Sequence, residues 1–481
     1  MNRRHVLNFT IVMTLLIRAV LLCVPFVFAS LPSFNDTSTH TLDASNCPSC
    51  NTRTLWNILL SCGLTLFACT WTAIHPNIPG MDEGKLAITS RRLCIMVIAL
   101  IAPELMITWA TRQFLSAREA ANAFNDEFCA DRAKTHGDDR DTSEGTVTLV
   151  NDISGASESS GAPRHAEFKG WTITHGFFAW MGGFMLYVDG KPRATLTPDE
   201  LRCFVRDGSV DMPVISEAEI EDRSKGDGLS KGIAILQLAW FVAQLVARYI
   251  QNLPITLLEI DTLAVAALTC IPYGLWWKKP KGVGCPYIVH LKATASLPDQ
   301  LTYDNADILP HYPSDGYCSY FRRIKLYLVY PFLSLMGIIV RISPRAARSR
   351  RVPSLGGYKQ TWNRPHASEI VLLTGCFSGM VFGGIHCLGW NYFFHRHTED
   401  ILWRTTSLGV ICAPVVISLD TLSYMRYWKN LKIFGLPLGL IASLIYITAR
   451  VTLIVLMILS LRSLPTGVYD TVAWTRFIPH L

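Results

Sequence analysis

The chain has 481 residues, of which 50% are apolar and 17% are charged, and its formal net charge is +7. Soluble domains carry about 25% charged residues, so this composition excludes an ordinary soluble domain and predicts a membrane protein. The basic residues cluster beside apolar runs, which is typical of membrane topology signals. No zinc-finger spacing and no nucleic-acid-binding motif occurs in the sequence. The expected partner is therefore the lipid bilayer and not a nucleic acid.

Residues 1–30 have the pattern of a secretory signal. Two arginines precede a long apolar stretch, which ends in small residues. This pattern is typical of a cleaved signal peptide or of an uncleaved signal anchor. Either one places residues 31–54 in the lumen or outside the cell, where Asn35 is a glycosylation acceptor. We therefore expect an integral membrane protein of the secretory pathway or the plasma membrane.

The fourteen cysteines divide into two groups. Eight lie in apolar runs, where cysteine behaves as a small hydrophobic residue. The others lie in polar segments and are candidates for disulfides in an oxidising compartment. They are Cys47, Cys50, Cys129, Cys203, Cys285 and Cys318. Cys47 and Cys50 form a CxxC motif without the second pair of a zinc ribbon or the βαβ pattern of a thioredoxin, which favours a structural disulfide.

Apolar runs predict an all-α fold of about seven transmembrane helices after the signal segment. The first two runs, Leu55–His75 and Leu93–Ala110, form a two-helix membrane unit over residues 55–111, and Pro103 interrupts the second run. The later units are a transmembrane hairpin (231–277), a cysteine-containing loop (278–325), four transmembrane helices (326–461, beginning with Leu326–Val340) and a polar tail (462–481).

A long loop at residues 112–230 separates the second and third spans. Its middle part, 130–165, is polar and lacks aromatic residues, which predicts disorder. Trp171–Val188 is apolar but contains a histidine and three glycines. We therefore expect a re-entrant, interfacial or protein-buried segment in preference to a span. Two capping boxes then predict short helices in a small polar subdomain at residues 190–228.

Charged loops predict which side of the membrane each loop faces. With the N-terminal segment outside, loops 76–92, 341–368 and 423–433 fall in the cytosol and hold most of the positive charge of the short loops. The same assignment places all six polar-segment cysteines outside. Lys278 is among the exceptions, because it flanks a helix on the outer side. If Trp171–Val188 crossed the membrane, every later loop would change sides.

Ionisable residues inside apolar helices are costly unless they are paired or hydrated, so they mark candidate sites. Glu104 and Arg450 lie at nearly the same predicted depth in helices that run in the same direction. We therefore predict a Glu104–Arg450 ion pair, which is either architectural or part of a transport or gating path. Arg248, Glu259 and Asp261 flank the turn of the transmembrane hairpin and are expected to pair across it.

The apolar run Glu369–Trp390 contains a face of small residues. At 100° per residue, Gly375, Gly379 and Gly383 fall on one side of a helix, and His386 lies on the same side. Glycines spaced by four residues allow a second helix to approach closely in lipid. The sequence therefore predicts tight helix packing at the three glycines, with an ionisable side chain carried into the interface.

Three roles stay open for His386. It is a hydrogen-bonded structural histidine, a proton- or ligand-binding residue, or a metal ligand together with His175, Cys387 and the histidines that follow the helix. A metal site needs three or four convergent ligands, and no spacing in the sequence enforces one. Neither a metal nor another cofactor is therefore predicted.

Five segments carry a resemblance to a known group of proteins. They are GGIHCLGWNYFFHRHTEDILWR (383–404), WTITHGFFAWMGGF (171–184), EIEDRSKGD (219–227), LPITLLEIDTLA (253–264) and ARVTLIVLMILSLRSLP (449–465). Through them, most of residues 46–481 resembles a large group of uncharacterised fungal multi-pass membrane proteins, abundant in mushroom-forming basidiomycetes. The resemblance implies a membrane location and a fungal source, and it carries over no activity and no catalytic residue.

Three classes of function follow. The first is a transporter-, channel- or sensor-like protein, although no internal inverted repeat is visible. The second is a membrane-embedded lipid-modifying enzyme, in which His386 acts with His175 or Glu104. The third is a structural membrane protein. A cavity shared by the three ionisable residues favours an enzyme, whereas separate helix contacts exclude it. Because motifs such as GxSxG or Walker A are absent, the expectation leans away from an enzyme.

Overall fold

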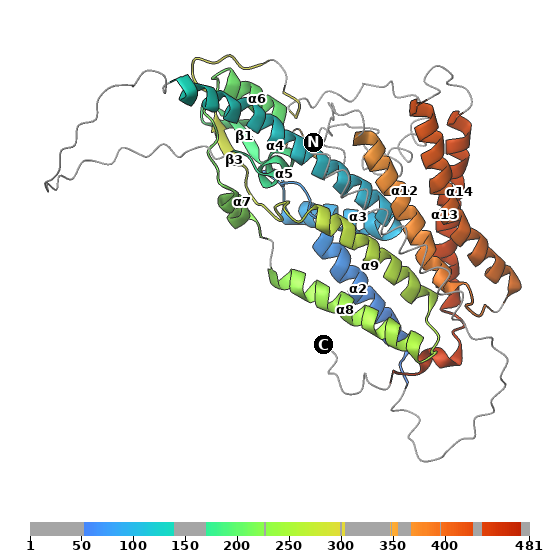
Figure 1. Cartoon of the computed structure of the whole chain (residues 1–481). Coiled ribbons are helices and arrows are strands. Elements are labelled where there is room, and N and C mark those ends of the chain that lie inside the picture. Colours follow the sequence, from blue (N-terminus) through green and yellow to red (C-terminus); the bar gives the residue numbers. More distant parts are fainter. Residues whose placement is uncertain are drawn as a thin grey trace, which may run out of the picture.

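The computed structural model describes residues 52–138, 170–225, 228–298, 301–303, 347, 349–354, 367–394, 396–426 and 435–472. Figure 1 shows long helices side by side, with a small unit of short helices and strands at one end of them. We call the end that carries this unit the subdomain end, and the opposite end of the long helices the distal end.

Six of the described helices are long and apolar enough to cross a membrane. They are α2 (Leu55–Ala73), α8 (Gly228–Ile250), α9 (Leu257–Leu275), α12 (Ala367–His386), α13 (His397–Arg426) and α14 (Gly435–Ser460). Large apolar side chains point outward from several of them, for example Leu60 of α2, Leu236 of α8 and Leu444 of α14. An apolar outer surface suits a lipid environment, whereas a soluble protein rarely exposes so much of it.

Helices α3 (Lys85–Ile101) and α4 (Pro103–Asp138) meet at a bend of 116°. Pro103 has no backbone N–H and suits the first position of a helix, so it ends α3 and begins α4. The predicted span Leu93–Ala110 is therefore not one straight helix. The geometry of the pair is that of a broken span or a re-entrant loop.

The small unit at the subdomain end contains strands as well as helices. Its elements are α5 (Ile173–Trp180), β1 (Phe184–Val188), β2 (Lys191–Thr195), α6 (Pro198–Arg206), α7 (Glu217–Arg223) and β3 (Tyr287–His290). We call this unit the α/β subdomain. β1 is the central strand, antiparallel to β2 and parallel to β3. The predicted all-α class is wrong here, because Asp189 and Gly190 adopt positive φ and form the two-residue turn of a β-hairpin.

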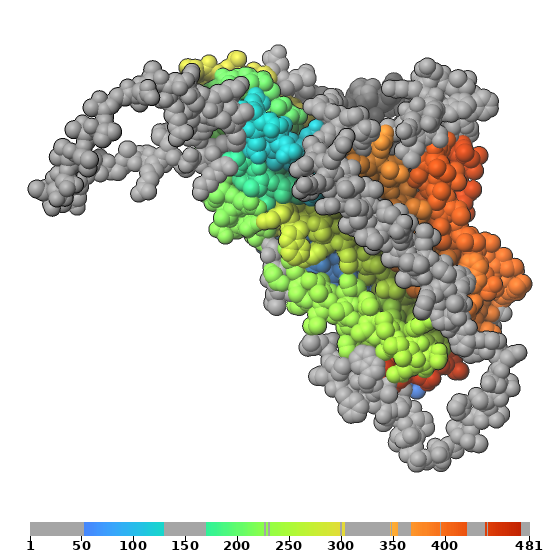
Figure 2. All heavy atoms as spheres, viewed as in Figure 1, coloured from blue at the N-terminus to red at the C-terminus, as the bar shows by residue number. Residues whose placement is uncertain are grey.

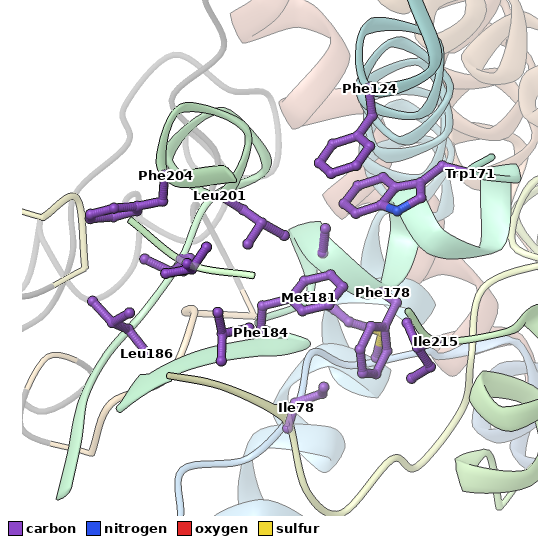
Figure 3. Close-up of a cluster of buried hydrophobic side chains, with 14 of the residues drawn as sticks. Ile78, Phe124, Trp171, Phe178, Met181, Phe184, Leu186, Leu201, Phe204 and Ile215 are labelled. Carbon is purple, nitrogen blue, oxygen red and sulfur yellow. The ribbon is translucent and has the colours of Figure 1, made fainter. Parts of the chain in front are cut away.

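An aromatic core joins this subdomain to α4. The ring of Trp171 stacks on that of Phe124, with 3.8 Å between centroids, and lies 5.7 Å from that of Phe184 (Figure 3). Asn125 fastens the same contact, since its side chain accepts from the backbone N–H of Trp171 and donates to its carbonyl oxygen. The segment Trp171–Val188 thus forms α5 and β1 and is buried within protein.

Segments far apart in the sequence meet at the subdomain end. The backbone N–H of Ile78 donates to the carbonyl oxygen of Met181 (3.0 Å), and the side chain of Asn77 donates to that of Pro353 (3.1 Å). We call loop 341–368 the basic loop. The loop after α2, the α/β subdomain and the described part of the basic loop therefore share one end. The predicted sidedness placed the loop after α2 and the basic loop in the cytosol, and the α/β subdomain on the outer side. Because all three share one end, this prediction is wrong. The bend between α3 and α4 returns the chain to the end where α3 began.

The distal end is closed by the segment around η2 (Thr466–Tyr469). Arg248 donates to four backbone carbonyl oxygens of this segment and of the α8–α9 turn. Arg53 pairs with Glu259 at 2.6 Å. The predicted pairing across the hairpin is thus replaced, because the carbonyl groups satisfy Arg248 and leave Glu259 to Arg53.

Some predictions lie outside the described residues. They are the signal segment 1–30, Asn35, Cys47, Cys50, Cys318 and the span Leu326–Val340. Of the predicted disordered stretch 130–165, the part up to Asp138 continues α4, and the rest lies outside the described residues.

Candidate functional site

His386 ends α12 and is buried among α9, α12 and α13, with 1% of its surface exposed. Its Nδ1 lies 2.9 Å from the carbonyl oxygen of Phe382, one turn earlier in α12. Its Nε2 lies 3.3 Å from Oδ1 of Asp261 in α9. The ring stacks on that of Phe382 and lies 5.6 Å from that of Trp403 in α13. His386 therefore joins helices from two separate parts of the chain.

Both ring nitrogens of His386 face oxygen atoms. A carbonyl oxygen only accepts hydrogen bonds, so Nδ1 carries a hydrogen atom toward Phe382. An ionised carboxylate also only accepts, yet Nε2 faces Asp261. A neutral imidazole has a single N–H, so a hydrogen bond between Nε2 and Asp261 needs a second proton, on Nε2 or on the carboxyl group. The side chain of Asp261 is 18% exposed.

Arg450 of α14 lies where α3 ends. Its Nη2 donates to the carbonyl oxygen of Ile101, which the bend leaves without a partner from its own helix. Its guanidinium carbon lies 3.5 Å from the centroid of the Phe382 ring. Arg450 thus stabilises the bend and at the same time contacts the residue on which His386 stacks.

The predicted Glu104–Arg450 ion pair is absent from the ion pairs of the described residues. One carboxylate oxygen of Glu104 and the hydroxyl group of Tyr446 are buried without a hydrogen-bond partner within the described chain. The prediction failed because the broken helix gives Arg450 a different acceptor, the carbonyl oxygen of Ile101. The depth of a residue along a predicted helix does not show which carbonyl oxygens lack a partner. The two residues nevertheless lie around the same bend.

A continuous line of contacts follows from these observations. Asp261 contacts His386, which stacks on Phe382 at 4.3 Å, and Phe382 underlies Arg450. The line connects the distal start of α9 with the bend between α3 and α4. A proton gained or lost at one end would change the charge next to packed aromatic rings along α12. We call these residues the α12 line.

The three glycines of α12 contact three different elements. A methyl group on Gly375 would collide with Thr108 of α4, and one on Gly383 would lie 2.7 Å from Ile411 Cγ1 of α13. A methyl group on Gly379 would lie 3.1 Å from Pro414 of α13 and 3.4 Å from the hydroxyl group of Tyr446 of α14. Close packing occurs at each glycine, so small movements of α12 cannot be absorbed by loose side chains.

The family described as a family of unknown function, DUF8562, matches residues 21–298 and 370–481. The chain belongs to this family. No curated protein and no solved structure matches the chain. The matched ranges include the whole α12 line, so the candidate site lies in the part of the chain by which DUF8562 is recognised.

In this DUF8562 chain, His175 lies in the α/β subdomain, apart from the α12 line. Its Nδ1 accepts from the backbone N–H of Thr172 (3.1 Å), and its Nε2–H donates to the carbonyl oxygen of Ile215 (2.9 Å). These partners suit a neutral imidazole, and burial lowers the pKa of His175. His175 therefore caps α5 and does not join His386 or Glu104 in a shared site.

The predicted disulfide candidates that can be placed are free thiols. Cys203 is half-buried in α6, and Cys285 is exposed just before β3. Cys129 lies in α4, but its side chain is outside the described residues. Among the described residues, no group of three or more histidine, cysteine, aspartate or glutamate side chains could hold a metal ion.

Sequence reasoning missed the role of Asp261 in this DUF8562 chain. It was assigned to the hairpin turn, although it is one turn inside α9. The capping box of Thr256 with Glu259 gives the missing signal, because it places the start of α9 after Thr256 and directs Glu259 backward to the cap. Asp261 then projects from the body of the helix, where only the tertiary structure supplies His386.

Proposed function

We propose that this chain is a multi-pass membrane protein of the transporter or sensor class, in which the Asp261–His386 pair binds and releases a proton. Six apolar helices support the membrane location, and the secretory pathway or plasma membrane is the proposed compartment. The resemblance to fungal membrane proteins adds a fungal source to the proposal.

One observation carries the proton-binding role: both nitrogens of the buried His386 ring face oxygen acceptors. A purely structural histidine satisfies one donor and one acceptor, as His175 does. Release of the extra proton leaves the Nε2 lone pair facing a carboxylate, which repels it. The pair then separates, and α9 and α12 move apart at the distal end. A proton-driven change of helix position is the step that transporters and sensors need.

A lipid-modifying enzyme receives less support. Its proposed acid–base residues lie at separate contacts. His386 belongs to the α12 line, Glu104 lies at the bend near Arg450, and His175 lies in the α/β subdomain. No observation favours the purely structural role over the proton-binding one.

The proposal is tested by infrared difference spectroscopy of the purified protein between pH 5 and pH 8. The wild-type protein is expected to show carboxyl and imidazole changes that disappear in Asp261→Asn and in His386→Gln. Asp420→Asn removes a carboxyl group from α13 and is the matched control. Identical spectra for the wild-type protein and Asp261→Asn contradict proton binding at the pair.

A second experiment separates the two classes of function. Metabolites and lipids are profiled in a fungal strain that lacks the gene and in one that carries His386→Gln. A changed distribution of a soluble solute, with lipid composition unchanged, supports the transporter or sensor class. A changed lipid composition in both strains supports the enzyme instead.

A further inference from the structure

Four basic residues gather around the end of α2 at the subdomain end. Arg92 donates to the carbonyl oxygen of Trp71 (2.8 Å), and Lys281 donates to that of Thr72 (2.9 Å). Lys279 is enclosed by the carbonyl oxygen of His75 (2.6 Å) and by two side-chain amides. Lys231 lies over the ring of Trp277, 5.2 Å from its centroid. We call these four side chains the basic cluster; they are Arg92, Lys231, Lys279 and Lys281.

The basic cluster has an excess of positive charge. The ion pairs of the described residues include none between these four side chains and a carboxylate. Burial lowers the pKa of Lys279 to about 7, so the charge excess rests on the other three side chains. The end of a helix carries only about half a negative charge, so the carbonyl groups of α2 do not balance Arg92, Lys231 and Lys281. Burial lowers the pKa of Lys281 to about 8, and repulsion by Arg92 and Lys231 adds to this effect. An anion at this place would relieve the repulsion.

An apolar groove runs from the basic cluster along the helices. α2, α8 and α9 line it, with Lys231 at its mouth and Cys69, Leu238 and Cys270 further along. Figure 2 shows a small patch of α2 (blue) between α8 (light green) and α9 (yellow-green). The hydroxyl group of Tyr273, another lining residue, has no hydrogen-bond partner among the described residues. Trp277 is 60% exposed beside the mouth, as expected at a membrane–water boundary.

We propose that this groove binds one anionic phospholipid from the leaflet at the subdomain end. The phosphate group lies among Lys231, Arg92 and Lys281, and the Tyr273 hydroxyl faces the same molecule. One acyl chain lies along α2, α8 and α9, where it covers apolar side chains. The charge of the basic cluster selects an anionic headgroup over a zwitterionic one. This site is separate from the Asp261–His386 pair and does not depend on the function proposed for it.

The test uses the full-length protein in detergent with dioleoyl phosphatidic acid or dioleoyl phosphatidylcholine as the probe. Phosphatidic acid is expected to slow maleimide labelling of Cys270 in the groove, while labelling of the exposed Cys412 on α13 stays unchanged. Lys231→Gln is expected to weaken phosphatidic acid binding about fivefold, and Lys231→Gln with Arg92→Gln more than tenfold. Binding is expected to weaken as salt is added.

Lys278→Gln is the matched control, because Lys278 lies at the same end but is paired with Glu217 and Glu221. Lys231 has no side-chain hydrogen bond to another described residue, so the single variant remains informative if the double variant fails to fold. Equal binding of the two lipids overturns the proposal. It is also overturned if Lys278→Gln loses as much affinity as Lys231→Gln.

Discussion

Arg450 donates to the carbonyl oxygen of Ile101, Arg248 to four carbonyl oxygens at the distal end, and Lys279 to that of His75. Each of these three described cations thus has a backbone oxygen as a partner, and Arg248 has only backbone oxygens. The last carbonyl groups of a helix lack partners and carry partial negative charge. Using them avoids the cost of removing a second ion, a carboxylate, from water. This explains why pairing opposite charges by depth gave the wrong partner for Arg450.

Replacing Arg450 by methionine is expected to destabilise the protein by about 2 kcal/mol, because it leaves the Ile101 carbonyl group unsatisfied. The free energy of unfolding in detergent measures the effect. Thr452→Val is the control, since the Thr452 hydroxyl only bonds a carbonyl oxygen of its own helix. Similar values for the two variants would contradict the role assigned to Arg450.

Glu83 connects the start of α3 with the basic loop through Arg91 and Arg351. Burial raises the pKa of Glu83, but hydrogen bonds from Arg91 and Gly80 and the charge of Arg351 outweigh it and lower the pKa to about 2. Its stabilising effect is present above the unfolded pKa of about 4.5 and is lost as the pH falls toward 2.

Glu83→Gln is therefore expected to lower stability by about 2 kcal/mol at pH 7. The difference from the wild-type protein should shrink as the pH falls from 4.5 to 2. Thermal unfolding across this range measures it, with the exposed neighbour Asp82→Asn as the control. A difference that stays constant with pH would exclude the ionised carboxylate as its cause.

Among the elements, α12 carries the glycines and His386. It meets α4 at Gly375, α13 at Gly383 and α9 through His386. Its packing leaves no room for an added methyl group at two of these contacts. The proton-dependent change proposed for His386 would therefore act on a helix whose position is tightly determined along its length.

Gly383→Ala is expected to destabilise the protein by about 2 kcal/mol, because its methyl group would meet both the side chain and the backbone of Ile411. The neighbouring Gly384 has no atom within 4 Å of an added methyl group, so Gly384→Ala is the matched control and should be neutral or slightly stabilising. Thermal unfolding in detergent compares the two. If both variants unfold at the same temperature, close helix approach does not explain Gly383.

For the whole molecule, the bend between α3 and α4 determines which segments share a side. Lys278 and Lys279, the exceptions in the predicted sidedness, lie at the same end as Arg91 and Arg92. With all of them together, the positive-inside rule predicts that the subdomain end faces the cytosol.

We therefore expect Cys285 and a cysteine introduced as Met81→Cys to react with a membrane-impermeant maleimide from the cytosolic side. A cysteine introduced as Phe393→Cys, at the distal end, should react only from the outside. Both introduced positions are exposed, at 51% and 73%. Labelling of Cys285 and Met81→Cys from opposite sides would show that the α3–α4 pair crosses the membrane.

The amino-acid sequence by itself determined the apolar helices and several local features. Hydropathy sets the length of a helix in lipid, and capping depends on neighbours in the chain, so Thr197 and Ser216 begin helices as predicted. The Asp189-Gly190 turn was equally local and would have revealed the β-hairpin. These features depend on contacts within a few residues.

Only the tertiary structure decided how these parts combine. The direction of α4 after Pro103 depends on its packing against α5 and α12. The partners of Arg450 and His386 come from helices more than a hundred residues away in sequence. The position of a residue along a helix does not specify how the helix is rotated about its axis. It also does not specify which backbone carbonyl groups lack a hydrogen-bond partner. The Asp261–His386 contact and the basic cluster depend on such contacts between distant segments, and for that reason they emerge only from the folded chain.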